Sequence, residues 1–140
     1  MTDWTTARVQ DRLELAADVF RALPGVKPRG YFSAWPAYFH SFGDQVGQEP
    51  RMRRPRPSPR MITEAEAALL WLRWLEKDDA RIVWLRANRQ PWKKIGWEVG
   101  LSRPAANRHW QYGIAVITWR LNGRRVPRKR SMKFVIAKAR

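Results

Sequence analysis

The chain has 140 residues, of which 28 are Lys or Arg and 12 are Asp or Glu, so its formal net charge is +16. Hydrophobic residues make up 44% of the sequence and include nine Trp, enough to build a core, which excludes a wholly disordered basic chain. The absence of cysteine excludes a disulfide scaffold, a thiolate metal site and a Cys nucleophile. We expect one compact domain, or a small domain with arms.

The N-terminal residues lack the basic-then-apolar order of a signal peptide. The longest uncharged run, residues 30–43, is shorter than the roughly 20 residues that a membrane span requires. The missing cysteine is also typical of a reducing cytoplasm. We therefore expect a cytoplasmic protein that makes no contact with a membrane.

The excess positive charge is concentrated in three stretches. Residues 51–60 carry +5, residues 91–123 carry +4 and residues 124–140 carry +8, whereas residues 1–50 carry −1 and residues 61–90 are neutral. Clustered cations on a folded scaffold are typical of proteins that bind a polyanion, because each neutralised phosphate releases condensed counterions. Nucleic acid is the predicted partner. The alternative is a solubilising or ribosome-type basic extension.

Residues 1–47 are predicted to be a helical, aromatic-rich N-terminal region. Between residues 5 and 23 apolar side chains recur every three or four residues, which predicts a helix with one buried stripe: Val9, Leu13, Ala16, Ala17, Phe20 and Leu23. Pro24 and Gly25 end this helix. Residues 31–42 contain six aromatic side chains and a proline, and we expect their rings either to complete the core or to contact a partner.

Residues 48–62 are predicted to be an extended linker rich in Arg and Pro. Four prolines between residues 50 and 59 deny this segment a helix and favour a semi-rigid backbone. Cations on such a backbone contact phosphates rather than base edges. The candidate contacts in the linker are Arg51, Arg53, Arg54 and Arg56.

The next two helices are predicted over residues 63–76 and 80–88. Thr63, with a glutamate three residues later, fits a capping box at the start of the first helix. Asp78 or Asp79 is placed to cap the second. The chain shows no strand alternation, so the predicted fold class is all-α.

After Pro91 the chain has the pattern of a helix-turn-helix. Gly100 can take the left-handed conformation that ends the first helix, and Pro104 is tolerated in the first turn of the second, after its cap Ser102. An inward stripe runs through both helices: Ile95, Val99, Leu101, Ala106, Trp110, either Gly113 or Ile114, and Ile117. The candidate contacts to nucleic acid or to a protein partner lie outward: Lys93, Lys94, Ser102, Arg103, Asn107, Arg108 and Gln111. The alternative is a docking fold that makes no contact with DNA.

Six tryptophans of residues 63–122 stand at helical spacing, and most of them are predicted to be core residues rather than base-stacking platforms: Trp71, Trp74, Trp84, Trp97, Trp110 and Trp119. Trp92, at the entry to this domain, fits either the core or the surface.

Residues 123–140 are predicted to be a basic tail that begins as a turn and ends in a short amphipathic stretch. The tail either lies along nucleic acid and folds when bound, or packs residues 134–136 on a partner. Its candidate contacts are Arg124, Arg125, Arg128, Lys129, Arg130 and Lys133.

Residues 81–86 read Arg-Ile-Val-Trp-Leu-Arg, and residues 95–103 read Ile-Gly-Trp-Glu-Val-Gly-Leu-Ser-Arg. This part of the chain resembles region 4 of bacterial sigma-70 factors, with similarity over about residues 63–121. The whole layout also resembles the small sigma-region-4-like regulators of gene-transfer-agent clusters in alphaproteobacteria. Sigma domains usually place Glu and Arg after the Ser-Arg pair, where this chain has Pro104 and Ala105.

The resemblance implies a sigma-like helix-turn-helix domain over residues 63–122. It also implies a transcription activator or antitermination factor that acts with bacterial RNA polymerase, near the β-flap and the RNA exit channel. The implied nucleic acids are DNA and nascent RNA.

An enzyme is the weakest alternative, because the acids are scattered and the sequence holds neither a Gly-rich phosphate loop nor a metal-ligand cluster. We expect no catalytic residue, no cofactor, no metal and no small-molecule substrate. Two other classes remain beside a polymerase factor. One is a phage-type DNA-packaging or recombination adaptor, and the other is an RNA-binding accessory protein.

Overall fold

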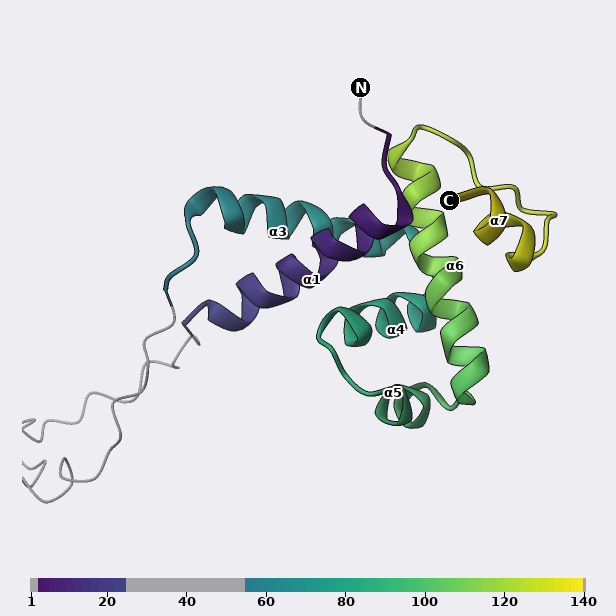
Figure 1. Ribbon diagram of the computed structural model, residues 1–140, viewed down its shortest axis with the longest axis horizontal. Coiled ribbons are helices and arrows are strands. Elements are labelled where there is room, and N and C mark those ends of the chain that lie inside the picture. Colours follow the sequence, from purple (N-terminus) through teal and green to yellow (C-terminus); the bar gives the residue numbers. More distant parts are fainter. Residues whose placement is uncertain (1–2, 25–54, 140) are drawn as a thin grey trace, which may run out of the picture.

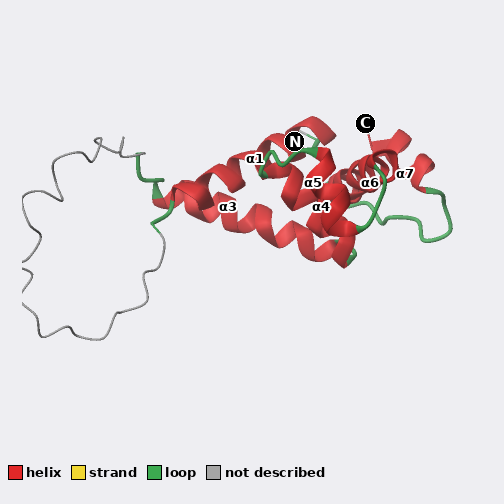
Figure 2. Ribbon diagram, turned by 90° about the horizontal axis from the view of Figure 1, so that it is seen from below, coloured by secondary structure: helices red, strands yellow, loops and turns green. Residues whose placement is uncertain are grey.

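A computed structural model describes residues 3–24 and 55–139, and Figures 1 and 2 show helices joined by loops. The described residues contain no strand, which confirms the all-α fold class. No described helix is long and apolar enough to cross a membrane. The aromatic residues 31–42 and Arg51, Arg53 and Arg54 lie outside the described residues. The elements are α1 (Thr6–Ala22), α3 (Pro59–Trp71), the 3-10 helix η2 (Leu72–Trp74), α4 (Lys77–Ala87), α5 (Trp92–Val99), α6 (Arg103–Leu121) and α7 (Met132–Ala139).

The main core joins α1 to α3, α4 and α6. The predicted stripe of α1 is buried over its first four members, and Leu13 is only 1% exposed. It packs against Ala65 and Ala68 of α3 and against Ile114 and Ile117 of α6. Figures 1 and 2 both show α1 lying beside α3. The N-terminal helix therefore shares one core with the domain predicted from residue 63 onward, because a single apolar stripe must be covered by other helices to leave water.

The start of α3 corrects two predicted boundaries. This helix begins at Pro59, four residues before Thr63, and the hydroxyl of its N-cap Ser58 accepts a hydrogen bond from the Met61 amide at 3.3 Å. Pro59 suits the first helical position, where no amide partner is needed. Thr63 lies inside the helix and donates its hydroxyl to the Pro59 carbonyl at 3.1 Å. The linker thus ends at residue 58, not at residue 62.

The start of α4 also differs from the prediction. Its N-cap is Glu76, whose side chain makes no capping hydrogen bond, and Asp78 and Asp79 lie within the first turn. Acidic side chains are favoured there by the positive end of the helix dipole. Asp79 is buried, and its Oδ1 lies 2.6 Å from Nδ1 of His109 on α6. This carboxyl group therefore ties α6 to α4 instead of capping a helix.

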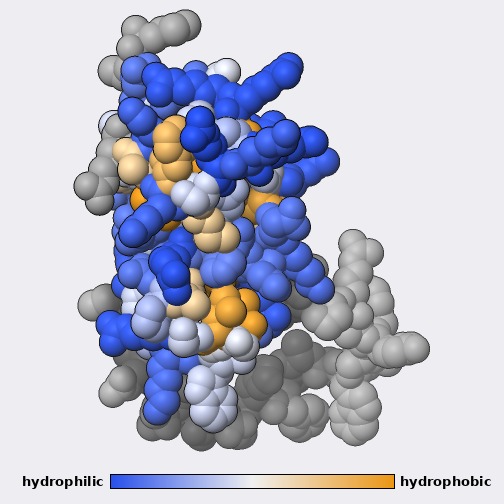
Figure 3. Space-filling model, turned by 90° about the vertical axis from the view of Figure 1, so that its right-hand side faces the viewer, coloured by the Kyte–Doolittle hydropathy of each residue, from blue (hydrophilic) through white to orange (hydrophobic). Residues whose placement is uncertain are grey.

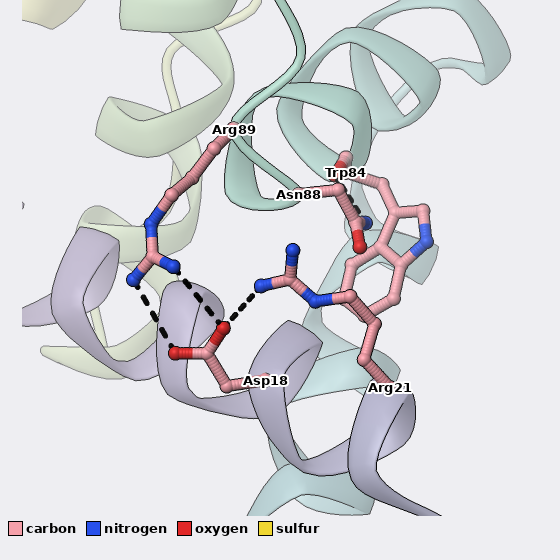
Figure 4. A network of polar contacts seen from close by, with 5 residues as sticks. All are labelled: Asp18, Arg21, Trp84, Asn88 and Arg89. Carbon is pink, nitrogen blue, oxygen red and sulfur yellow. Dashed lines mark hydrogen bonds and ion pairs between the residues drawn. The ribbon is translucent and has the colours of Figure 1, made fainter. Parts of the chain in front are cut away.

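The end of α1 is fastened to the turn between α4 and α5 (Figure 4). Arg89 in this turn has a left-handed φ of 58°, which is uncommon for a residue with a Cβ atom. Its guanidinium donates to both carboxylate oxygens of Asp18, at 3.4 and 3.3 Å. Arg21 donates to the same carboxylate from α1 itself. Asn88 donates its side-chain amide to the Trp84 carbonyl at 2.9 Å and so closes the end of α4.

Glu64 joins α1 to α3 through two arginines. Arg60 Nε donates to Glu64 Oε1 at 3.0 Å, and Arg12 Nη1 of α1 donates to Glu64 Oε2 at 2.8 Å. These hydrogen bonds hold the pKa of Glu64 below its ordinary value, and the bond from Arg60 has the larger effect.

We expect Glu64→Gln to lower stability at neutral pH and to match the wild type in acid. A lowered folded-state pKa means that Glu64 stabilises the fold above its unfolded pKa and loses this effect as the pH falls through the folded pKa. Urea unfolding of both proteins across acidic and neutral pH measures the difference. Glu66→Gln, exposed on the same helix and without an ion pair to any described residue, is the control. A difference that persists unchanged in acid contradicts the expectation.

Candidate nucleic-acid interface

The α5–α6 pair encloses a small core with α4. Ile82, Ile95 and Ala106 are fully buried there, and the partly buried residues around them include Val99, Leu101 and Trp110. Most of the predicted inward stripe thus lies in this core, and its last members Ile114 and Ile117 lie in the main core. The sequence pattern placed these side chains correctly, although residues 113–118 of α6 are buried consecutively and not on one stripe alone.

The turn between α5 and α6 has the predicted backbone. Gly100 has a φ of 73°, the left-handed conformation that ends α5. A Cβ atom built on Gly96 would lie 2.7 Å from the Leu101 carbonyl oxygen, so the turn closes directly against α5. Ser102 occupies the N-cap position of α6 but makes no capping hydrogen bond, and Pro104 lies in the first turn.

The predicted contacts at the start of α6 lie at the surface on two stripes. Arg103 and Gln111 are exposed and Asn107 is half-buried, and their four-residue spacing places these three side chains on one stripe. Arg108 is also exposed, on a second stripe beside the first. Lys93, Lys94 and Ser102 are also exposed. The two helices therefore present four exposed cations, two at the start of α5 and two in the first half of α6: Lys93, Lys94, Arg103 and Arg108.

Arg108 lies on the side of α6 that α7 covers further along the helix. Ala115 and Trp119 follow Arg108 by about two and three helical turns and return to the same side. Ala115 is buried against Val135 of α7, and Trp119 Nε1 donates to the Val135 carbonyl at 3.2 Å. Arg108 and α7 therefore lie on the same side of α6.

The predicted basic tail is a folded part of the molecule. Val135 is fully buried, Ile136 is half-buried, and Phe134 is 36% exposed with the Arg130 guanidinium 5.1 Å from its ring centre. The amphipathic stretch needs neither nucleic acid nor a partner to fold, in contrast to the prediction, because Ala115 and Trp119 of α6 offer an apolar surface on which it packs. The cations before it lie on the loop between α6 and α7, and all are exposed: Arg124, Arg125, Arg128, Lys129 and Arg130.

The α6–α7 side of the molecule carries cations that form no ion pair with a described acidic residue, although Glu76 and Asp79 line a pocket together with Arg120 and Arg128. From Val99 to the C-terminus the chain has 11 Lys or Arg and no Asp or Glu. None of these Lys or Arg side chains in α6, α7 or their loop forms an ion pair with an acidic residue of the described chain, whereas the five paired arginines are Arg12, Arg21, Arg60, Arg81 and Arg89.

Figure 1 shows α7 and its loop on one side of α6, away from α3, and Figure 3 shows that hydrophilic side chains cover most of this side. Unpaired clustered cations produce a field that attracts a polyanion. We call this surface the cationic face; it comprises Arg108, Arg124, Arg125, Arg128, Lys129, Arg130 and Lys133.

Most of the six tryptophans at helical spacing are partly buried, as predicted, but two are exposed. Trp97 is 83% exposed and Trp74 is 38% exposed, whereas the other four are partly buried. On α5 the inward position is taken by Trp92. Its ring centre lies 6.0 Å from that of Trp110, and the Arg86 guanidinium stacks on its ring. Trp97 follows five residues later, about 140° around the helix, and so points outward. Spacing within a single eight-residue helix did not reveal which of its two tryptophans faces the core.

A family model for a domain of unknown function, DUF6362, matches residues 21–117, which is more than half of the chain. The chain belongs to the DUF6362 family. No curated protein and no solved structure matches it. The DUF6362 match contains α3, α4 and α5 and most of α6, and therefore includes Lys93, Lys94, Arg103 and Arg108.

The DUF6362 match covers some of the remaining candidate contacts of this protein and leaves out others. Arg56, exposed before α3, lies inside it, and the loop and α7 cations lie outside it. Among residues 3–24 and 55–139, no group of three or more His, Asp or Glu side chains is placed to hold a metal ion.

Proposed function

We propose that the protein is a nucleic-acid-binding regulator of transcription that acts with bacterial RNA polymerase, as an antitermination factor, an activator or both. The observation that supports nucleic-acid binding is the cationic face, whose side chains are exposed and have no acidic partner among the described residues. Phosphates are the natural counter-charges of such a surface, and their neutralisation drives binding through counterion release.

The α5–α6 pair provides a shape suited to duplex DNA. Two helices meet at a short turn, and the exposed start of the second carries Arg103 and Arg108. A helix-turn-helix inserts the start of its second helix into the major groove. Pro104 and Ala105, however, offer no side-chain donor or acceptor to a base edge. The proposed binding therefore relies mainly on phosphates and tolerates many sequences.

The proposed role of RNA polymerase follows from this weak base readout. A protein that binds phosphates and contacts few base edges has little sequence specificity, so it cannot find a particular DNA site efficiently by itself. Attachment to polymerase would deliver it to transcribed DNA, and the resemblance of residues 81–103 to sigma region 4 supports that partner. From the RNA exit channel its cations would contact emerging RNA and hinder a terminator hairpin.

The duplex part of the proposal is tested with Arg108→Ala. We expect weaker binding to a duplex oligonucleotide and a salt slope reduced by about 0.9, the contribution of one phosphate contact. The thermal midpoint should hardly change, because Arg108 is exposed. Arg21→Ala is the control, since Arg21 lies on α1 and its charge is engaged by Asp18. Unchanged binding by Arg108→Ala removes this residue from the interface.

The transcription part is tested with purified polymerase on a template that carries an intrinsic terminator. Readthrough should rise when the protein is added, and it should rise less with Arg108→Ala than with Arg21→Ala. A change in initiation without a change in readthrough would exclude antitermination and support only the activator role. If neither changes and the protein does not bind polymerase, the role in transcription fails, whatever the duplex measurement shows.

A further inference from the structure

Trp97 is the most exposed large hydrophobic side chain among the described residues, at 83%. No aromatic ring or guanidinium of the described chain stacks on it, in contrast to Trp4, which has Trp71 and Arg8, and to Trp92. The indole ring is thus available to a partner. Exposed tryptophans that serve no core are enriched where proteins bind other molecules.

The neighbours of Trp97 on α5 are cations. Lys93 and Lys94 are both exposed, and helical geometry places them about 40° and about 60° from Trp97, on opposite sides of it. The adjacent acid Glu98 is engaged by Arg81 of α4, whose Nη2 lies 3.4 Å from Glu98 Oε2. The outer surface of α5 therefore presents a flat aromatic ring between two positive charges.

We propose that Trp97 stacks on an unpaired base of single-stranded nucleic acid, while Lys93 and Lys94 bind the phosphates on either side. Proteins that bind single strands combine aromatic platforms with cations along the backbone. A duplex hides the faces of its bases within the stack, so the ring has no equivalent partner there. The inference rests on the proposed function for its class of partner, and it adds a second binding mode on a different helix from the cationic face.

A nucleic acid is favoured over an acidic protein by the charges around this surface. Lys93 and Lys94 are exposed beside Trp97, the adjacent acid Glu98 is paired with Arg81, and no acid follows Glu98 in the sequence. A regular polyanion satisfies both lysines at once. An acidic peptide would need several carboxylates at matching positions as well as a pocket for the indole.

The experiment measures the affinity of the full chain for a labelled single strand and for the duplex of the same sequence. Trp97→Ala and Trp97→Leu should weaken single-strand binding about 5- to 100-fold, the range of base–aromatic stacking, while Trp97→Phe retains most of it. Duplex binding should stay unchanged in all three variants. Because Trp97 is exposed, their thermal midpoints should match the wild type. Leu70→Ala, which removes a 56% exposed apolar side chain from α3, is the control and should change neither affinity.

The outcomes separate this inference from the proposed function. If Trp97→Ala binds the single strand as the wild type does, the stacking site does not exist and the indole is left as an anchor for a protein. If Trp97→Leu retains the affinity, or if duplex binding falls equally, stacking on an unpaired base is also refuted. A wild type that binds duplex but no single strand overturns the inference alone, whereas one that binds neither overturns the proposed function as well.

Discussion

Neutralising the loop and α7 cations should remove most of the salt dependence of DNA binding. The variant replaces six exposed residues by Gln: Arg124, Arg125, Arg128, Lys129, Arg130 and Lys133. If each binds one phosphate, the slope of log affinity against log salt falls by about 5, at about 0.9 per contact. Between about 50 and 200 mM salt the wild type should then lose about 1,000-fold more affinity than the variant.

Substitution is the correct test here, because deletion of residues 124–140 would uncover Ala115 and Trp119, on which α7 packs. The six side chains make no ion pair with a described acidic residue, so the thermal midpoint should stay close to that of the wild type. A matched comparison sets Lys129→Gln with Lys133→Gln against Arg12→Gln with Arg21→Gln on α1. Equal salt slopes for these two double variants would show that the cationic face does not bind DNA.

Leu13→Ala should lower the free energy of unfolding by about 2–5 kcal/mol, the cost of a cavity in a packed core. Leu13 is 1% exposed and lies in the core that joins α1 to α3, α4 and α6. Because this core is shared, the loss should appear as one unfolding transition that moves as a whole. Urea unfolding followed by both circular dichroism and tryptophan fluorescence measures it.

Leu15→Ala provides the comparison on the same helix. Leu15 is 54% exposed, so its truncation should change stability by less than about 0.5 kcal/mol. A separate N-terminal region would behave differently from the shared core. In that case Leu13→Ala would shift one transition and leave a second, belonging to α3–α6, in place.

Local signals in the sequence were enough to determine several elements. The stripe of α1 followed from apolar residues at three- and four-residue spacing, and four of its members are buried. The end of α5 followed from Gly100, because a left-handed residue stops a helix whatever surrounds it. The acid-free C-terminal part of the chain is likewise a property of composition, and it is what predicts a polyanionic partner.

Packing between distant residues decided the rest. Periodicity shows that a helix has an apolar side but not what covers it, so only the tertiary structure placed α1 in the core of α3, α4 and α6 and docked α7 on α6. Ser58 and Thr63 both fit the start of a helix, and α3 begins at the earlier one, where Pro59 suits the first position. Trp92 and Trp97 share one short helix, and the position of Trp110 decided which of them turns inward. The outward Trp97, and the binding site inferred from it, are therefore consequences of tertiary packing.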